Sequence, residues 1–107
     1  MAVAYLKEQG YCLIEKNWRF KNFEIDILAK NDSTLIFVEV KFRNKSILST
    51  VDIISSAQKK RIIKAAHHYI QKNEINLNIR FDLIFIDNSS KNPKLRHFKE
   101  FFTPYFD

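Results

Sequence analysis

Residues 33–42, STLIFVEVKF, decide the fold of this chain because they join a buried strand to two charges. The first part is an uninterrupted apolar run, LIFV at 35–38, which is typical of a strand covered on both faces. Glu39 and Lys41 follow two residues apart, so they share one face of the strand. Because burial of an unpaired charge costs several kcal/mol, we expect these two side chains to have partners or a function.

The composition predicts one domain spanning residues 1–107. Hydrophobic residues make up 46% of the chain and include ten Phe, which argues against disorder. No apolar stretch approaches the roughly 20 residues of a membrane span, and the N-terminus MAVAYLKEQGY lacks the pattern of a signal peptide. The single cysteine, Cys12, excludes an internal disulfide and a CxxC metal site. These features predict a cytoplasmic protein of bacterial type with no membrane segment.

The charge pattern indicates a polyanionic partner. The net charge is +6, from 18 basic and 12 acidic residues. Clustered Lys and Arg side chains are what a phosphate backbone attracts, although charge alone does not identify nucleic acid. The candidates for nucleic-acid contacts follow the strand at 34–42 or lie in the next predicted helix, and they are Arg43, Lys45, Lys59, Lys60, Arg61 and Lys64.

The remaining periodicity predicts an α+β chain. A helix over 2–9 ends at Gly10, the only glycine, which suits a helix C-terminus. A hairpin is expected over 23–42, and Ser49 and Thr50 are candidate caps for the second helix. The other expected elements are a strand at 11–20, a helix from about Val51 to Lys72, a strand at 79–86, and an edge strand or short helix at 95–102. This order favours a mixed central sheet of four to five strands flanked by helices.

Two carboxylates of the predicted hairpin form the candidate chemical site. Asp26 and Glu39 lie side by side if the turn falls around residues 31–33. Such a pair can hold Mg²⁺ or Mn²⁺ through oxygen ligands and leave positions for water and phosphate. Lys41, on the same face as Glu39, can orient or deprotonate a water or stabilise charge during attack on a phosphodiester.

A plainer interpretation is also open. Glu24 with Asp26, and Glu39 with Lys41, are pairs that cross-strand ion pairing on a solvated sheet face would also produce. A single glycine excludes a Walker loop or a dinucleotide-binding fingerprint. His67 and His68 are adjacent on a helix and point about 100° apart, which is poor geometry for one metal, so they have a structural or DNA-facing role. Nothing supports a Ser-His-Asp triad.

A resemblance extends this interpretation. The segments YLKEQGYCLIEKNWRF, FEIDILAKNDSTLIFVEVKFR, KKRIIKAAHHYI and RFDLIFI resemble the YraN-type family of bacterial proteins along nearly the whole chain. That family looks like the restriction-endonuclease-like superfamily and is similar to archaeal Holliday-junction resolvases. The resemblance implies a restriction-endonuclease-like fold and a D…E-x-K core of Asp26, Glu39 and Lys41, with Asp26 and Glu39 as metal ligands. It also implies a catalytic position for Gln58 and a phosphate contact for Arg43.

The chain departs from the family pattern in two places. Phe23 stands where the family usually has Gly before EID. The resemblance also implies an N-terminal glutamate one turn before Ala2, a position ahead of Met1, and resolvases use such a residue in metal binding. Glu24 substitutes for it only if its side chain points inward; otherwise it is a solvated edge charge.

These observations predict a metal-dependent nuclease-like protein that acts on DNA, including branched DNA, as a homodimer. The alternative is a module of the same fold that binds nucleic acid without cleaving it. A third interpretation is an interaction protein that uses its Phe-rich C-terminus, FKEFFTPYF at 98–106. We expect those aromatic side chains to lie in the core or in a dimer contact.

Overall fold

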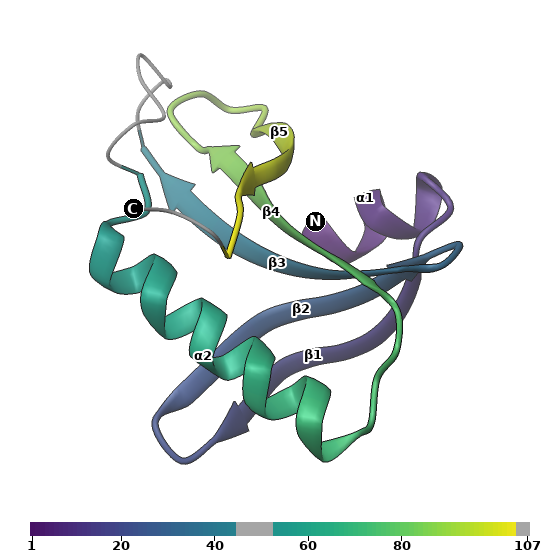
Figure 1. The fold of residues 1–107 in the computed structure, drawn as a ribbon. Helices are drawn as coiled ribbons and strands as arrows, with labels where there is room; N and C mark the ends of the chain where they lie inside the picture. The colour runs from purple at the N-terminus through teal and green to yellow at the C-terminus, as the bar shows by residue number, and fades with distance from the viewer. Residues whose placement is uncertain (45–52, 105–107) are drawn as a thin grey trace.

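The computed structural model describes residues 1–44 and 53–104, and Figure 1 shows the path of the chain. The described elements follow the order α-β-β-β-α-β-β and are α1 (Ala2–Glu8), β1 (Cys12–Phe20), β2 (Phe23–Asn31), β3 (Thr34–Arg43), α2 (Ser56–Lys72), β4 (Asn78–Asp87) and β5 (Lys94–Phe102). Neither helix in the described part of the chain is long and apolar enough to cross a membrane.

The five strands form one mixed sheet in the order β1-β2-β3-β4-β5. β3 and β4 are parallel, with α2 in the connection between them, and every other neighbouring pair is antiparallel. The predicted α+β class and mixed central sheet flanked by helices are therefore confirmed. The segment that the sequence left undecided at 95–102 is an edge strand, β5.

A hydrophobic core lies on each face of the sheet. Helix α2 covers one face through Ile62, Ala65, Ala66 and Tyr69, which pack on Phe37 and its neighbours. Helix α1 covers the other face through Ala2 and Leu6. The short helix ends where Gly10 adopts a φ of +89°, a conformation that glycine reaches without steric strain. The apolar run at 35–38 is fully buried because β3 lies between these two layers.

The hairpin of β2 and β3 confirms the predicted turn. Asn31 pairs with Thr34, so Asp32 and Ser33 form a two-residue loop. Asp32 has a φ of 55°, in the left-handed region that Asp tolerates better than most residues. The same register pairs Ile27 with Val38, and the ladder between β2 and β3 ends at that pair.

The start of α2 differs from the prediction. The helix begins at Ser56, and its N-cap is Ser55, whose Oγ accepts a hydrogen bond of 3.1 Å from the backbone N–H of Gln58. The predicted cap residues Ser49 and Thr50 and the predicted start at Val51 lie outside the described residues. An apolar stripe continues before the helix because residues 53 and 54 also pack on the core. The apolar pattern therefore predicted a start for the helix that is too early, because residues 53–55 are not helical.

Ile25 and Ile27 lie on opposite sides of the sheet, although strict alternation along a strand would put them on one face. Ile25 packs in the core under α2, and Ile27 packs in the core under α1. The change occurs where β2 leaves β3, since pairing between the two strands stops at Ile27. Alternation applies to a regular paired strand and fails where the strand separates from its neighbour.

A buried polar cluster on the α1 side holds β5 against β4. The side chain of Asp82 is fully buried and accepts hydrogen bonds from Arg80 Nε and Nη2, each at 2.8 Å, and from the backbone N–H of Glu100 at 3.0 Å. His97 Nε2 lies 2.7 Å from the same carboxylate. Its ring is nearly inaccessible, so His97 is a structural residue that the sequence pattern alone did not explain.

The Phe-rich C-terminus lies in the core as far as the structure describes it. Phe102 is buried and stacks on Phe81 with ring centroids 4.9 Å apart. Phe98 and Phe101 are partly buried and pack against the same core. The expectation of core aromatics is confirmed for these residues, and Tyr105 and Phe106 lie outside the described part.

Candidate metal and nucleic-acid site

Asp26 marks the point at which β2 and β3 separate. The register that pairs Ile27 with Val38 would next place Asp26 opposite Glu39, but the backbone ladder ends before that pair. Instead, Asp26 Oδ2 accepts a hydrogen bond of 2.9 Å from the backbone N–H of Val40. The carboxylate thus occupies the place of a backbone acceptor, which holds it beside β3 and satisfies a donor that would otherwise lack a strand partner.

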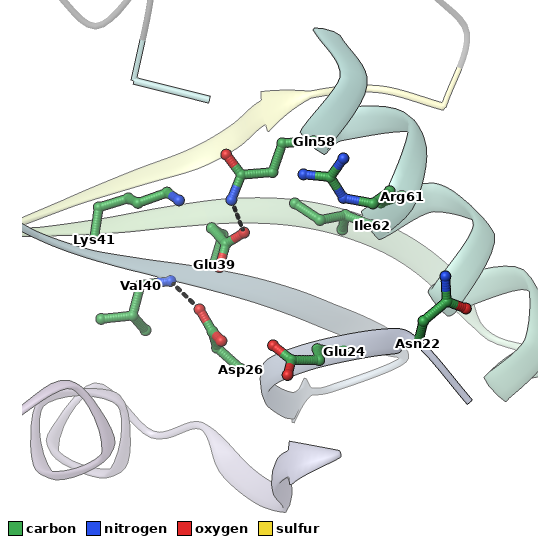
Figure 2. Close-up of a pocket in the computed structure, with 9 residues that line it drawn as sticks. All are labelled: Asn22, Glu24, Asp26, Glu39, Val40, Lys41, Gln58, Arg61 and Ile62. Atoms are coloured by element: carbon green, nitrogen blue, oxygen red, sulfur yellow. Dashed lines mark hydrogen bonds between the residues drawn. The ribbon is translucent and has the colours of Figure 1, made fainter. Parts of the chain in front are cut away.

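Glu39 points to the face of β3 that α2 covers. It alternates with Leu35 and Phe37, which both pack in the core under that helix. Gln58, in the first turn of α2, donates a hydrogen bond of 3.0 Å from Nε2 to Glu39 Oε2. Figure 2 shows this side chain reaching from the helix to the strand. The packing of the crossover helix therefore brings together two residues that are 19 positions apart in the sequence.

The two carboxylates interact directly. Burial, a side-chain hydrogen bond with Asp26 and the negative charge of Asp26 raise the pKa of Glu39 from its ordinary value of 4.5 to about 8. The positive charge of Lys41 and the hydrogen bond from Gln58 act in the opposite direction but are weaker. At neutral pH Glu39 therefore tends to keep its proton, because a carboxyl group in a partly buried site beside another carboxylate resists taking a negative charge.

The oxygen donors of this pair suit a hard divalent cation. A cation between the carboxylates removes the repulsion that otherwise retains a proton, and carboxylate oxygens are the donors that Mg²⁺ and Mn²⁺ prefer. Among residues 1–44 and 53–104, however, no cluster of three or more His, Cys, Asp or Glu side chains is arranged to hold a metal. Water or a phosphate would therefore have to supply most of the ligands.

A polar pocket of about 340 Å³ opens beside the pair. Figure 2 shows the side chains that line it, which come from β2, β3, α2 and the turn before β2. They are Asn22, Glu24, Asp26, Glu39, Val40, Lys41, Gln58, Arg61 and Ile62. All four residues predicted as catalytic, Asp26, Glu39, Lys41 and Gln58, thus line one pocket, together with the basic residue Arg61.

Glu24 and Asn22 form the rim on the β2 side. Glu24 is exposed and makes an ion pair of 3.0 Å with Arg19, which matches the solvated edge charge expected if its side chain does not point inward. Sequence reasoning missed Asn22. The signal was present, because Asn22, Glu24 and Asp26 recur at every second residue, the spacing that places side chains on one side of an extended chain.

The other predicted nucleic-acid contacts are spread over the surface. Arg43 is exposed and donates a hydrogen bond from Nη1 to the carbonyl of Phe42 at 2.8 Å. Lys59 lies on the β5 side of α2, with Nζ 5.9 Å from the ring of Phe102. Lys60 and Lys64 are exposed one turn apart on the outer surface of the helix. Lys45 lies outside the described residues.

Comparison with known proteins places this architecture in a family. The pattern of the Uncharacterised protein family UPF0102 matches residues 1–86. A UPF0102 protein of Shewanella sediminis is 50% identical over 88 residues, which cover 81% of this chain and 75% of the relative. A UPF0102 protein of Flavobacterium psychrophilum is 36% identical over 103 residues, covering 95% and 87%. One of Bacteroides thetaiotaomicron is 38% identical over 104 residues, covering 96% and 86%.

These matches include the strands that carry Asp26, Glu39 and Lys41 and the helix that carries Gln58. They confirm the resemblance to the YraN-type family that the segments around those residues predicted. The chain belongs to the Uncharacterised protein family UPF0102.

Proposed function

We propose that this protein is a metal-dependent, endonuclease-like protein that acts on DNA, including branched DNA. The observation that carries the proposal is the placement of Asp26 and Glu39 side by side in a polar pocket that Lys41 and Gln58 also line. A partly buried glutamate whose pKa is strongly raised beside a second carboxylate is typical of a functional site.

The residues of the pocket have distinct roles in this proposal. Asp26 and Glu39 would hold Mg²⁺ or Mn²⁺, which would polarise a phosphodiester and lower the pKa of an attacking water. Gln58 keeps Glu39 oriented through its hydrogen bond. Lys41 is half-buried at the same pocket and stabilises negative charge that develops on the phosphate, or takes a proton from water.

Arg61 is the basic residue best placed to position a phosphate. It is exposed, lies in the first turns of α2 and lines the same pocket as the carboxylates. The net charge of +6 supports attraction of a polyanion over a longer range. Together these features favour a nucleic acid over a small neutral substrate.

A homodimer completes the proposal. One pocket cuts one strand, so symmetric cleavage of two strands requires two copies, and twofold symmetry is the commonest arrangement of identical subunits. β1 and β5 are the outer strands of the sheet, and either edge offers backbone groups for pairing with a second copy.

The test is cleavage of labelled linear, flapped and four-way DNA in the presence of Mn²⁺ or Mg²⁺. We expect wild-type protein to cut at least one of these substrates, and Asp26→Asn and Glu39→Gln each to abolish cutting without loss of folding. Glu8→Gln is the matched control, because it removes an exposed carboxylate on α1 that does not line the pocket. Metal-dependent cutting that survives both pocket substitutions would refute the site.

A non-catalytic nucleic-acid-binding module of the same fold is the second candidate. The observation in its favour is that the described residues contain no third His, Cys, Asp or Glu near the pair in a metal-holding arrangement. In that case wild-type protein binds DNA with the usual salt dependence but shows no metal-dependent cleavage. The same assay, run beside a binding titration, separates the two functions.

A further inference from the structure

A second hollow lies beside the C-terminal half of α2, beyond Arg61 along the helix. It has a volume of about 320 Å³ and is lined by Trp18, Phe20, His68, Gln71 and Lys72. We call it the aromatic hollow. These residues come from the end of β1 and from the last turns of α2, so the hollow forms only when the helix packs across the β1–β2 hairpin. In Figure 1 the turn of that hairpin projects past α2 on the side away from β5.

The rings in the hollow offer flat faces. Trp18 and Phe20 are nearly parallel, with centroids 6.3 Å apart and planes 21° apart. His68 lies 5.4 Å from Phe20 and 4.9 Å from Phe23, again with tilted rather than perpendicular planes. Three aromatic side chains, Trp18, Phe20 and His68, therefore line one opening, although His68 is 50 positions from Trp18 in the sequence. Phe23 lies behind them in contact with His68.

Packing of the core explains only part of this cluster. Trp18 meets Tyr69 edge to face, with centroids 5.4 Å apart, and Phe23 also packs against the core under α2. Phe20 is half-exposed. Among the described residues, it is not one of the apolar side chains that pack on either core. Its contacts are instead with Trp18, His68 and two lysines.

Positive charge surrounds the same ring. Lys21 Nζ lies 5.5 Å and Lys72 Nζ 5.9 Å from the centroid of Phe20. Both lysines are exposed, so each ammonium can leave the ring and meet a phosphate. Aromatic faces flanked by cations are the combination by which proteins hold unpaired nucleotides, because bases stack on the rings while phosphates meet the charges.

The hollow is also suitably placed relative to the carboxylate pocket. Arg61 lines the pocket and His68 lines the hollow. They are seven positions apart on one helix, a rise of about 10 Å. On the strand side, Glu24 at the pocket rim directly follows Phe23, which contacts His68. A nucleic acid that enters the pocket therefore has a second contact within a few nucleotides along α2.

We infer that the aromatic hollow binds an unpaired base of a single-stranded nucleic-acid segment, by stacking on Phe20 and its neighbouring rings with Lys21 and Lys72 at the adjacent phosphates. This inference deepens the proposed function and rests on it for the nature of the substrate: the protein would favour nucleic acid with a single-stranded segment next to a duplex over a fully paired one.

Trp18 provides a direct readout, since it is the only tryptophan and lies in the hollow. The full chain is titrated with an eight-nucleotide oligo(dT) in EDTA, where metal-dependent cleavage cannot occur, and Trp18 fluorescence is followed. Anisotropy of a labelled copy of the same oligonucleotide gives an independent affinity. An oligonucleotide of the same length with abasic sites in place of bases carries the phosphates without the stacking surface.

We expect saturable quenching by oligo(dT) and an affinity for the abasic oligonucleotide that is at least about 5-fold weaker, because each stacked base contributes about 5- to 150-fold in affinity. Phe20→Leu keeps an apolar side chain but removes the ring, and should weaken oligo(dT) binding about 5-fold or more. Phe101→Leu makes the same change in a partly buried ring on β5, the opposite edge of the sheet, and should leave binding unchanged. Thermal melts confirm that both variants fold.

The inference is overturned if the abasic oligonucleotide binds as tightly as oligo(dT), which would mean a purely electrostatic contact. It is also overturned if Phe20→Leu and Phe101→Leu bind oligo(dT) equally well, or if an acidic peptide of equal charge quenches Trp18 as strongly. These outcomes are distinguishable from failure of the proposed function. Quenching that requires Phe20 but persists in Asp26→Asn supports the hollow even if no DNA is cleaved, and cleavage without such quenching supports the pocket alone.

Discussion

The carboxylate of Asp26 accepts the backbone N–H of Val40 at 2.9 Å, at the point where β2 no longer pairs with β3. A side chain thus replaces the backbone acceptor that the next ladder position would have supplied. The same carboxylate raises the pKa of Glu39 through a hydrogen bond and through its charge. Asp26 therefore joins the architecture of the sheet to the electrostatics of the pocket, and changes at the site should be visible in stability as well as in function.

Glu39→Gln should change how stability depends on pH. The pKa of Glu39 is raised in the folded protein from 4.5 to about 8, so its protonated form favours folding. That contribution is fully present below about pH 4.5 and is lost as the pH rises through about 8. Glutamine mimics the neutral acid and still accepts the hydrogen bond from Gln58. Thermal melts from pH 5 to 9 should show the variant gaining on wild type at alkaline pH, whereas parallel curves would contradict a raised pKa.

Divalent metal should stabilise wild-type protein more at alkaline pH than at acidic pH. A cation must displace the proton that Glu39 retains because of its raised pKa, and proton release makes binding stronger as pH rises. The shift in melting temperature caused by Mn²⁺ should be larger at pH 8.5 than at pH 6.5. It should disappear in Asp26→Asn and persist in Glu8→Gln, which removes an exposed carboxylate of α1 outside the pocket. Equal shifts in all three proteins would place the metal elsewhere.

Lys41→Ala should separate catalysis from binding. The change removes a cation from the pocket but leaves both carboxylates, so cleavage should fall by roughly 100-fold or more if the lysine stabilises developing charge. DNA affinity should change little, because one phosphate contact is a small part of a multi-contact interface. Single-turnover cleavage and a binding titration on the same junction provide the comparison. Lys60→Ala, on the exposed outer surface of α2, is the matched control and should cleave normally.

Arg61 and Lys60 are adjacent in the sequence but should differ in DNA binding. Arg61 lines the pocket, whereas Lys60 does not. Arg61→Ala should weaken binding and reduce the slope of log affinity against log salt by about one, the value for one lost phosphate contact. Lys60→Ala should have a clearly smaller effect. Equal losses in the two variants would indicate that the long-range charge of the helix matters more than the pocket.

Asp82→Ala should be among the most destabilising single changes. It removes the acceptor for Arg80, His97 and the backbone N–H of Glu100, and leaves Arg80 without its buried partner. Removal of one member of a buried ion pair costs about 3–5 kcal/mol. Urea unfolding measures the loss. Glu8→Ala removes an exposed acid from α1 and should have little effect, so a similar small loss at both positions would show that the Asp82 cluster contributes little.

The hairpin and the carboxylate pair could be predicted from the residue pattern alone. The prediction used three local features: period-two alternation, a short polar turn at Asp32 and Ser33, and the spacing of Asp26 from Glu39. Such features can be recognised without knowledge of the rest of the fold. The burial of residues 35–38 followed from their uninterrupted apolar character for the same reason. Two predictions from local patterns failed. Strand alternation failed beside Ile25, where β2 separates from β3, and hydrophobic periodicity did not locate the start of α2.

Contacts between residues far apart in the sequence depend on how the helices and strands pack in three dimensions. The packing of α2 placed Gln58 on Glu39 and Arg61 at the pocket, while Lys59 turned toward Phe102 on the other side. The parallel pairing of β3 with β4, followed by β5, buried Asp82 beside His97. The aromatic hollow likewise joins the end of β1 to the end of α2. These contacts depend on the direction of a helix across a sheet, a global property that neither propensity nor spacing along the chain encodes.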